Sequence, residues 1–245
     1  MRDDTSKSAP RRRGDVCIAL DFPTRAEILA MARLVAGRVG WLKVGLEAFV
    51  AEGPGLVADV AATGAKVFLD LKLHDIPATV AGAVAAAARS GADMVNVHAS
   101  GGRAMLEAAR EAADRARLPR LIAVTLLTSL DAKALADLPM AGYPEGIARR
   151  LALLAKASRL DGVVCAATDV VGIRDACGPD FLTVVPGIRP AGAGLQDQKR
   201  TATPEAALRD GAGMLVIGRP VTAAPDPRAA LDAILDEIAA VPGRA

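Results

Sequence analysis

The segment FLDLKLHDIPATV, residues 68–80, places Asp70, Lys72 and Asp75 at the end of an apolar run. A lysine in such surroundings has a pKa that burial and neighbouring charges can shift, so it can act as a proton donor or as a base. Groups this close together are expected to titrate as a coupled set and not independently. The segment therefore indicates either proton-transfer chemistry or a structural ion-pair network.

A second group of polar residues lies nearer the end of the chain. The segment PGIRPAGAGLQDQKR, residues 186–200, is rich in glycine and long for a connection, which is typical of a loop that covers an active site. The sequence GRP at 218–220 supplies a backbone N–H and the Arg219 guanidinium. These groups suit a phosphate dianion, although a surface charge is the alternative for Arg219.

Short apolar runs rich in strand-forming residues recur along the chain, with segments typical of helices between them. The predicted strands are 16–20, 39–44, 65–71, 92–97, 121–127, 161–166, 181–186 and 213–218. The predicted helices include 25–37, 78–90, 102–116, 145–159, 204–210 and 227–240; the last but one begins with an N-cap threonine and a proline, Thr203 and Pro204.

Alternating strands and helices predict a parallel sheet covered by helices, and near-continuous apolar runs fit strands buried on both faces. Eight such units in 245 residues match a (β/α)8 TIM barrel of the α/β class. An open doubly wound sheet is the alternative. The first strand is followed by DFPTRAE rather than by a glycine fingerprint, which favours the barrel.

In a barrel of this kind the chemistry lies at the carboxyl ends of the strands. Asp21 follows the first predicted strand and Lys43 ends the second. Side chains two apart on a strand share a face, so Asp70 and Lys72 can both point into the mouth of the barrel. These four charges are expected to converge there. The later strands are followed by further polar residues, namely Thr128, Ser129, Arg189, Gly218 and Arg219.

His74 and His98 are the two histidines of the chain. His98 ends the fourth predicted strand, where it either lines the pocket or is a hydrogen-bonded structural residue. Two histidines are too few for a typical zinc site, and the three cysteines, Cys17, Cys165 and Cys177, show no C-x-x-C spacing. This cysteine usage favours a reducing cytoplasm.

The chain as a whole is expected to form one catalytic barrel domain, residues 15–245, after a disordered tail, residues 1–14. The tail carries the run Arg11–Arg13 and has no apolar core of a secretory signal. The formal net charge of +2 gives no support to nucleic-acid or membrane-surface binding. The sequence has no run of about 18 apolar residues, so no membrane-spanning helix is predicted.

The sequence DLKLHDIPATV at 70–80 resembles the signature of the orotidine 5′-phosphate decarboxylase family, in its bacterial form. The resemblance covers nearly all of the chain after residue 14. It extends through ALDFP at 19–23, WLKVG at 41–45, VNVHASGG at 95–102, AVTLLTS at 123–129, PGIRP at 186–190, DQKR at 197–200, ATPEAAL at 202–208 and VIGRPVT at 216–222.

The resemblance implies the last step of UMP synthesis, without a metal or an organic cofactor. It implies that Lys72 delivers a proton to C6 of the pyrimidine, within a charged array of Lys43, Asp70 and Asp75. It also implies a homodimer in which Asp75 and Thr79 reach into the partner's site. Asp21, Lys43 and Thr79 would contact the ribose, Thr128 the pyrimidine, and Arg189, Gln198, Gly218 and Arg219 the phosphate. Gln198 is preferred to Gln196 because it follows an aspartate.

The chemistry of this reaction fits the residues. Loss of CO2 from C6 leaves an electron pair in the plane of the ring, where the π system cannot delocalise it. A fixed ammonium at Lys72 can stabilise that charge and then protonate the carbon. Phosphate contacts remote from C6 can supply binding energy that aligns the base.

Two alternatives remain at this point. A magnesium-dependent sugar-phosphate decarboxylase or aldolase of the same barrel group also carries a D-x-K-x-x-D pattern. It would need an acidic metal ligand at the end of the second strand, where this sequence has Lys43. A catalytically silent barrel that only binds nucleotides or partners is the other alternative.

Overall fold

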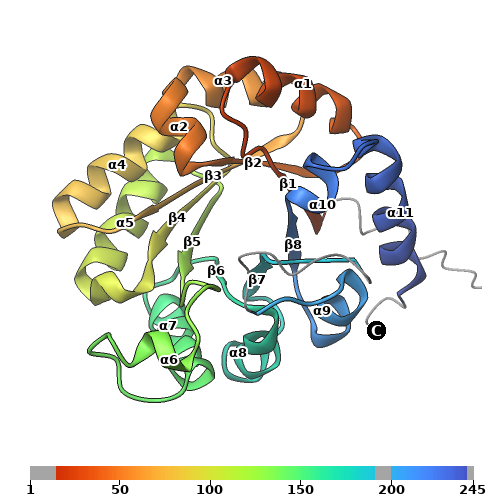
Figure 1. Ribbon diagram of the computed structural model, residues 1–245. Helices are drawn as coiled ribbons and strands as arrows, with labels where there is room; N and C mark the ends of the chain where they lie inside the picture. Colours follow the sequence, from red (N-terminus) through yellow and green to blue (C-terminus); the bar gives the residue numbers. More distant parts are fainter. Residues whose placement is uncertain (1–14, 191–199, 242–245) are drawn as a thin grey trace, which may run out of the picture.

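The computed structural model describes residues 15–190 and 200–241, which form a closed barrel of parallel strands surrounded by helices (Figure 1). Each strand pairs with the next, and β8 pairs with β1 to close the barrel. The predicted (β/α)8 fold is confirmed. The strands are β1 (Val16–Ala19), β2 (Trp41–Gly45), β3 (Lys66–Leu73), β4 (Met94–His98), β5 (Arg120–Val124), β6 (Gly162–Val164), β7 (Leu182–Val185) and β8 (Met214–Ile217).

The outer helices that the sequence predicts are found within two residues of their expected limits: α1 (Arg25–Val35), α4 (Pro77–Arg89), α5 (Gly102–Ala116), α7 (Pro144–Ala157), α9 (Pro204–Asp210) and α11 (Pro227–Ala240). The Thr203 side chain accepts a hydrogen bond from the Ala206 amide, as an N-cap does. Shorter helices were not predicted: α2 (Leu46–Glu52), α3 (Gly55–Ala61), α6 (Ala132–Leu135), α8 (Val170–Cys177) and α10 (Arg219–Thr222), with the 3-10 turns η2 (Ala99–Gly101) and η3 (Ala167–Asp169).

Burial on both faces of the strands produces two layers of apolar packing. One cluster lies between the strands and the helices and includes Ile18, Leu42 and Leu69. The other fills the barrel itself, with Phe68 and Met94 among its members. These alternating positions explain why the strands read as continuous apolar runs.

The amino-terminal end of the barrel is closed by Trp41, the single tryptophan of the chain. Lys66 and Arg120, the first residues of β3 and β5, place their cationic groups 5.5 Å and 5.4 Å from the centre of the Trp41 ring. Cations at this distance over an indole face are attracted by its negative potential. This end of the barrel is therefore a packed floor.

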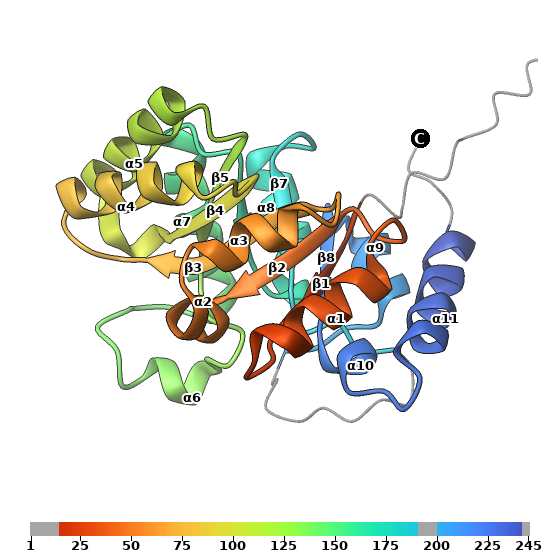
Figure 2. The same ribbon diagram turned by 90° about the horizontal axis from the view of Figure 1, so that it is seen from above.

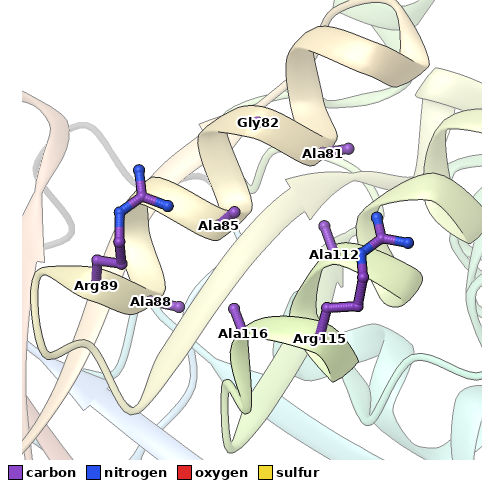
Figure 3. Close-up of a pocket in the computed structure, with 8 residues that line it drawn as sticks. All are labelled: Ala81, Gly82, Ala85, Ala88, Arg89, Ala112, Arg115 and Ala116. Carbon is purple, nitrogen blue, oxygen red and sulfur yellow. The ribbon is translucent and has the colours of Figure 1, made fainter.

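The helices α4 and α5 pack side by side through small residues (Figure 3). A cavity of about 500 Å³ lies between them, and its lining consists of alanines, Gly82 and the arginines Arg89 and Arg115. None of these lining side chains can act as a nucleophile or as an acid–base group near neutral pH. The cavity therefore offers no catalytic constellation.

The short helices α2, α6 and α10 lie at one edge of the molecule (Figure 2). They follow β2, β5 and β8 directly in the chain, so this edge contains the carboxyl ends of the strands. None of the helices in residues 15–190 and 200–241 combines the length and the apolar character of a membrane-spanning segment.

Candidate active site

A cavity of about 620 Å³ opens at the carboxyl ends of the strands. Its floor includes Phe68 and Val216, which belong to the apolar cluster inside the barrel. The remainder of the lining is polar and comes from segments far apart in the sequence. Nine of the residues singled out from the sequence line this cavity: Asp21, Lys43, Asp70, Lys72, Thr128, Ser129, Arg189, Gly218 and Arg219.

Four charged side chains form a continuous chain on one side of the cavity. Lys43 Nζ lies 3.0 Å from Asp21 Oδ1 and 3.3 Å from Asp70 Oδ2. Lys72 Nζ lies 2.7 Å from the other oxygen of that carboxylate, Asp70 Oδ1. The charges alternate in sign along this chain, so each one is stabilised by its neighbours.

The buried members of this chain remain ionised despite their burial. Removal from water alone would raise the pKa of Asp70, but Lys43, Lys72 and the hydrogen bonds that it accepts hold that pKa below its ordinary value. Burial alone would lower the pKa of Lys43, but Asp70 and Asp21 raise that pKa above its ordinary value. The cavity therefore contains a fixed carboxylate between two ammonium groups.

The backbone of β3 is irregular where it enters the site. Its pairing with β4 shifts register between Leu69 and Leu73. Lys72, within this shift, has a φ of 52°, in the left-handed region that a residue with a Cβ seldom adopts. Both Asp70 and Lys72 line the cavity, as their spacing predicts, although a bulge rather than a regular strand orients them.

Asn96 on β4 contacts both Asp70 and Lys72, and it was not identified from the sequence. Its side chain is fully buried. Asn96 Oδ1 accepts a hydrogen bond of 2.8 Å from the Lys72 backbone N–H, and Nδ2 donates one of 2.7 Å to Asp70 Oδ1. In the sequence this residue sits within VNVH, an apolar run, and only the bulge in the neighbouring strand gives it two polar partners.

Another part of the cavity lining comes from the ends of β7 and β8. Arg189 is buried, and its backbone N–H donates to the carbonyl of Ala202, which holds the two described ends of the connection after β7 together. Gly218 and Arg219 lie at the end of β8. Two guanidinium groups on one wall suit a ligand that carries a phosphate. Gln198 lies outside the described residues, as do most of the predicted loop and the predicted tail.

Asp75 and Thr79 are exposed, and among the described residues they do not line this cavity. Asp75 Oδ1 accepts a hydrogen bond of 2.6 Å from the Ile76 amide, just before α4 begins. Thr79 lies in the first turn of that helix. Within one chain the structure therefore does not bring these two residues to the charged array.

The two histidines contact each other beside the array, with their ring centres 5.4 Å apart. His98 is half-buried at the end of β4, whereas His74 is exposed. Burial, then His74 and Lys72, lower the pKa of His98, and Asp70 opposes this shift only in part. His98 is thus a neutral imidazole near neutral pH.

The segment that carries Thr128 is tied to a buried ion pair. Both Asp169 oxygens accept from Arg200 Nη1, at 3.1 Å and 3.0 Å. Arg200 Nη2 donates to the carbonyl of Leu127, the residue before Thr128, at 3.4 Å. One guanidinium therefore links three segments around the cavity, after β5, β6 and β7.

Comparison with known proteins identifies the family. The family model described as "Orotidine 5'-phosphate decarboxylase / HUMPS family" matches residues 14–234. The chain is 54% identical to the orotidine 5′-phosphate decarboxylase of Anaeromyxobacter sp. (strain K) over 219 residues, 89% of this chain and 96% of that one. It is 55% identical to the protein of the same name from Halorhodospira halophila, over 91% of this chain and 95% of the relative.

Solved structures agree with this result. The crystal structure of orotidine 5′-phosphate decarboxylase from Lactobacillus acidophilus is 35% identical and superposes with a TM-score of 0.80, covering 91% of this chain and 98% of that one. An uncharacterized conserved protein from Geobacillus kaustophilus is 42% identical, with the same TM-score, over 91% of this chain and 99% of that one. The chain with the Asp21–Lys43–Asp70–Lys72 array therefore belongs to the orotidine 5′-phosphate decarboxylase / HUMPS family.

Proposed function

We propose that this protein is a carboxy-lyase that converts orotidine 5′-phosphate to UMP and CO2, the last step of de novo pyrimidine synthesis. The names of the curated relatives support this proposal, since they match nearly the whole chain at more than half identity. The observation that carries it within the structure is the Lys72 ammonium, held 2.7 Å from a buried carboxylate inside the cavity.

The array suits the chemistry of this reaction. The bond between C6 and the carboxylate carbon breaks, CO2 leaves, and the electron pair remains on C6. The Lys72 ammonium stabilises that pair and then gives it a proton, so the C6–H bond forms and the neutral amine regains a proton from water. Asp70, which Lys43 contacts on its other oxygen, holds the ammonium in place before the substrate enters, so little reorganisation is needed during the step.

The rest of the cavity suits the rest of the substrate. Asp21 and Lys43 bind ribose hydroxyls in this proposal, and Thr128 faces the pyrimidine. Arg189, Arg219, the Gly218 backbone and Gln198 bind the phosphate. Binding energy from the phosphate, remote from C6, aligns the base against Lys72. The reaction needs no metal and no organic cofactor.

The magnesium-dependent sugar-phosphate enzymes are the second candidate, because the family model also spans the HUMPS group. In that chemistry a carboxylate at the end of β2 binds the metal. In this chain Lys43 occupies that position, and its ammonium contacts two carboxylates instead. Among residues 15–190 and 200–241, no three His, Cys, Asp or Glu side chains are grouped as a metal site.

The protein acts in this proposal as a cytoplasmic homodimer of single catalytic domains, residues 15–245. The exposed positions of Asp75 and Thr79 at the start of α4 support shared sites, because these side chains are available to a second subunit. Each subunit would then complete its partner's array.

The first test is turnover of orotidine 5′-phosphate in excess EDTA, followed by the ultraviolet absorbance change as UMP forms. We expect metal-free turnover that is lost in Lys72→Ala. The matched control is Lys66→Ala, which removes a lysine from the same strand at the floor of the barrel and should leave turnover intact. Turnover only with magnesium would support the sugar-phosphate enzymes, and ligand binding without turnover would support a silent barrel.

A further inference from the structure

The backbone at Lys72 is in a conformation that the chain alone does not favour. A φ of 52° brings the Cβ of a non-glycine residue close to its own backbone, so neighbouring groups must hold it there. The register shift between β3 and β4 also removes the regular ladder partner that this part of β3 would have. The Lys72 N–H donates to a side chain, the Asn96 amide oxygen, in place of a strand carbonyl.

The other end of the same amide holds Asp70. Asn96 Nδ2 and Lys72 Nζ both donate to Asp70 Oδ1, each at 2.7 Å. Asp70 Oδ2 is left to face Lys43. The carboxylate therefore cannot rotate without losing the Asn96 hydrogen bond, and Asn96 is itself fully buried among strands.

We infer that Asn96 is a positioning residue for the decarboxylation, because its single amide fixes both the backbone of the proton donor Lys72 and the carboxylate that orients the Lys72 ammonium. This inference rests on the proposed function. The carboxamide meets both needs at every pH, with an acceptor toward the backbone N–H and a donor toward the carboxylate. Asn96 does not line the cavity, so it acts through Asp70 and Lys72 and not on the substrate.

Two substitutions separate the two hydrogen bonds. Asn96→Asp keeps an acceptor for the Lys72 N–H but places a carboxylate against Asp70, unless that carboxylate is protonated. Asn96→Leu removes both hydrogen bonds and keeps the number and branching of the side-chain heavy atoms. The matched control is Thr183→Val: Thr183 is also fully buried on a barrel strand, and its hydroxyl bonds Gly211 and Gly213 away from the cavity.

For both Asn96 variants we expect kcat to fall by about tenfold to a hundredfold, because small misplacements of a catalytic group are costly. KM should change by less than about threefold, since the contacts to substrate remain. The activity of Asn96→Asp should rise as the pH is lowered, because protonation restores a donor toward Asp70, whereas Asn96→Leu should show no such recovery. Thr183→Val should lose thermal stability but keep its kcat.

The fraction of folded protein is measured by UMP binding, and kcat is expressed per binding site. A loss of folded protein alone therefore does not lower the measured kcat. An unchanged kcat in Asn96→Leu, or a pH profile of Asn96→Asp parallel to the wild type, would overturn the inference. A wild-type protein without turnover would instead contradict the proposed function. In that case a crystal structure of Asn96→Leu decides: an unchanged φ at Lys72 and an unmoved Asp70 would still refute the positioning role.

Discussion

Gly45 and Asp21 approach each other so closely that a Cβ built on Gly45 would lie 2.6 Å from Asp21 Oδ1. The same Cβ would lie 3.0 Å from Lys43 Nζ. Gly45 pairs with Asp70 across β2 and β3, at the level of the charged array. Position 45 must therefore lack a side chain for Asp21 and Lys43 to form their ion pair.

Gly45→Ala should displace Asp21 from Lys43. Asp21 is the proposed ribose contact, so we expect KM to rise by about tenfold, the cost of a hydrogen bond to a charged group, with a smaller fall in kcat. Steady-state kinetics measure both. Gly172→Ala is the control, since nothing lies within 4 Å of the Cβ that it adds in α8. Kinetics of Gly45→Ala equal to those of the control would contradict the close contact.

Arg219→Ala should weaken binding of the phosphate. Loss of a charge-assisted hydrogen bond is expected to raise KM for orotidine 5′-phosphate by about tenfold to a hundredfold. Turnover of orotidine, which lacks the phosphate, should be unaffected when measured at high enzyme concentration. Equal losses with both substrates would show that Arg219 acts on the fold of the site and not on the phosphate.

Mixing Lys72→Ala with Asp75→Ala tests the shared sites. In a random mixture half of the dimers contain one subunit of each kind, and one site in such a dimer has both residues. We expect subunit exchange to restore about a quarter of wild-type activity, as a two-fold symmetric dimer requires. The separate proteins, at the same concentration, provide the baseline. Activity that stays at this baseline after exchange, shown by mass-tagged subunits, would argue against an Asp75 supplied by the partner.

His98 should make the folded protein sensitive to mild acid. Its pKa in the folded state is lowered, first by burial and then by His74 and Lys72, with Asp70 opposing. The unfolded chain therefore binds a proton at higher pH than the folded protein, and stability falls as the pH drops below about 6.5. Asp70, whose folded pKa is also lowered, adds a second loss only below its ordinary value.

His98→Gln should reduce the loss of folding stability below about pH 6.5. The further loss that Asp70 causes at lower pH should remain. Urea unfolding between pH 7.5 and about pH 3, compared for the two proteins, measures the slope in both pH ranges. Identical slopes would mean that His98 titrates alike in both states.

The fold could be predicted because the same unit recurs eight times, and each unit carries its own apolar strand and helix signal. The short helices α2, α3, α6, α8 and α10 could not, because four to eight residues give too weak a periodic signal and none of them begins with the threonine–proline pair that marks the equally short α9. Contacts with neighbouring elements stabilise them: α8, for example, packs against α7, and α3 packs against α1 and β3.

The charged residues of the site could be predicted because charges at the ends of apolar strands are conspicuous. Asn96 was missed because a bulge in β3 brings its hydrogen-bond partners to it, and no residue type in the sequence indicates that bulge. Lys72 would be assigned a regular strand conformation from its neighbours, yet its φ is positive. Local propensity describes the strands well and fails where the site holds the backbone against it.

The tryptophan at the floor of the barrel makes the two ends of the molecule separately observable. Trp41 is the one indole fluorophore of the chain, and it sits between Lys66 and Arg120 at the end opposite the cavity. Its emission therefore reports the integrity of the barrel floor, with little interference from events at the mouth. A variant of the charged array that keeps the native emission spectrum has lost chemistry and not architecture.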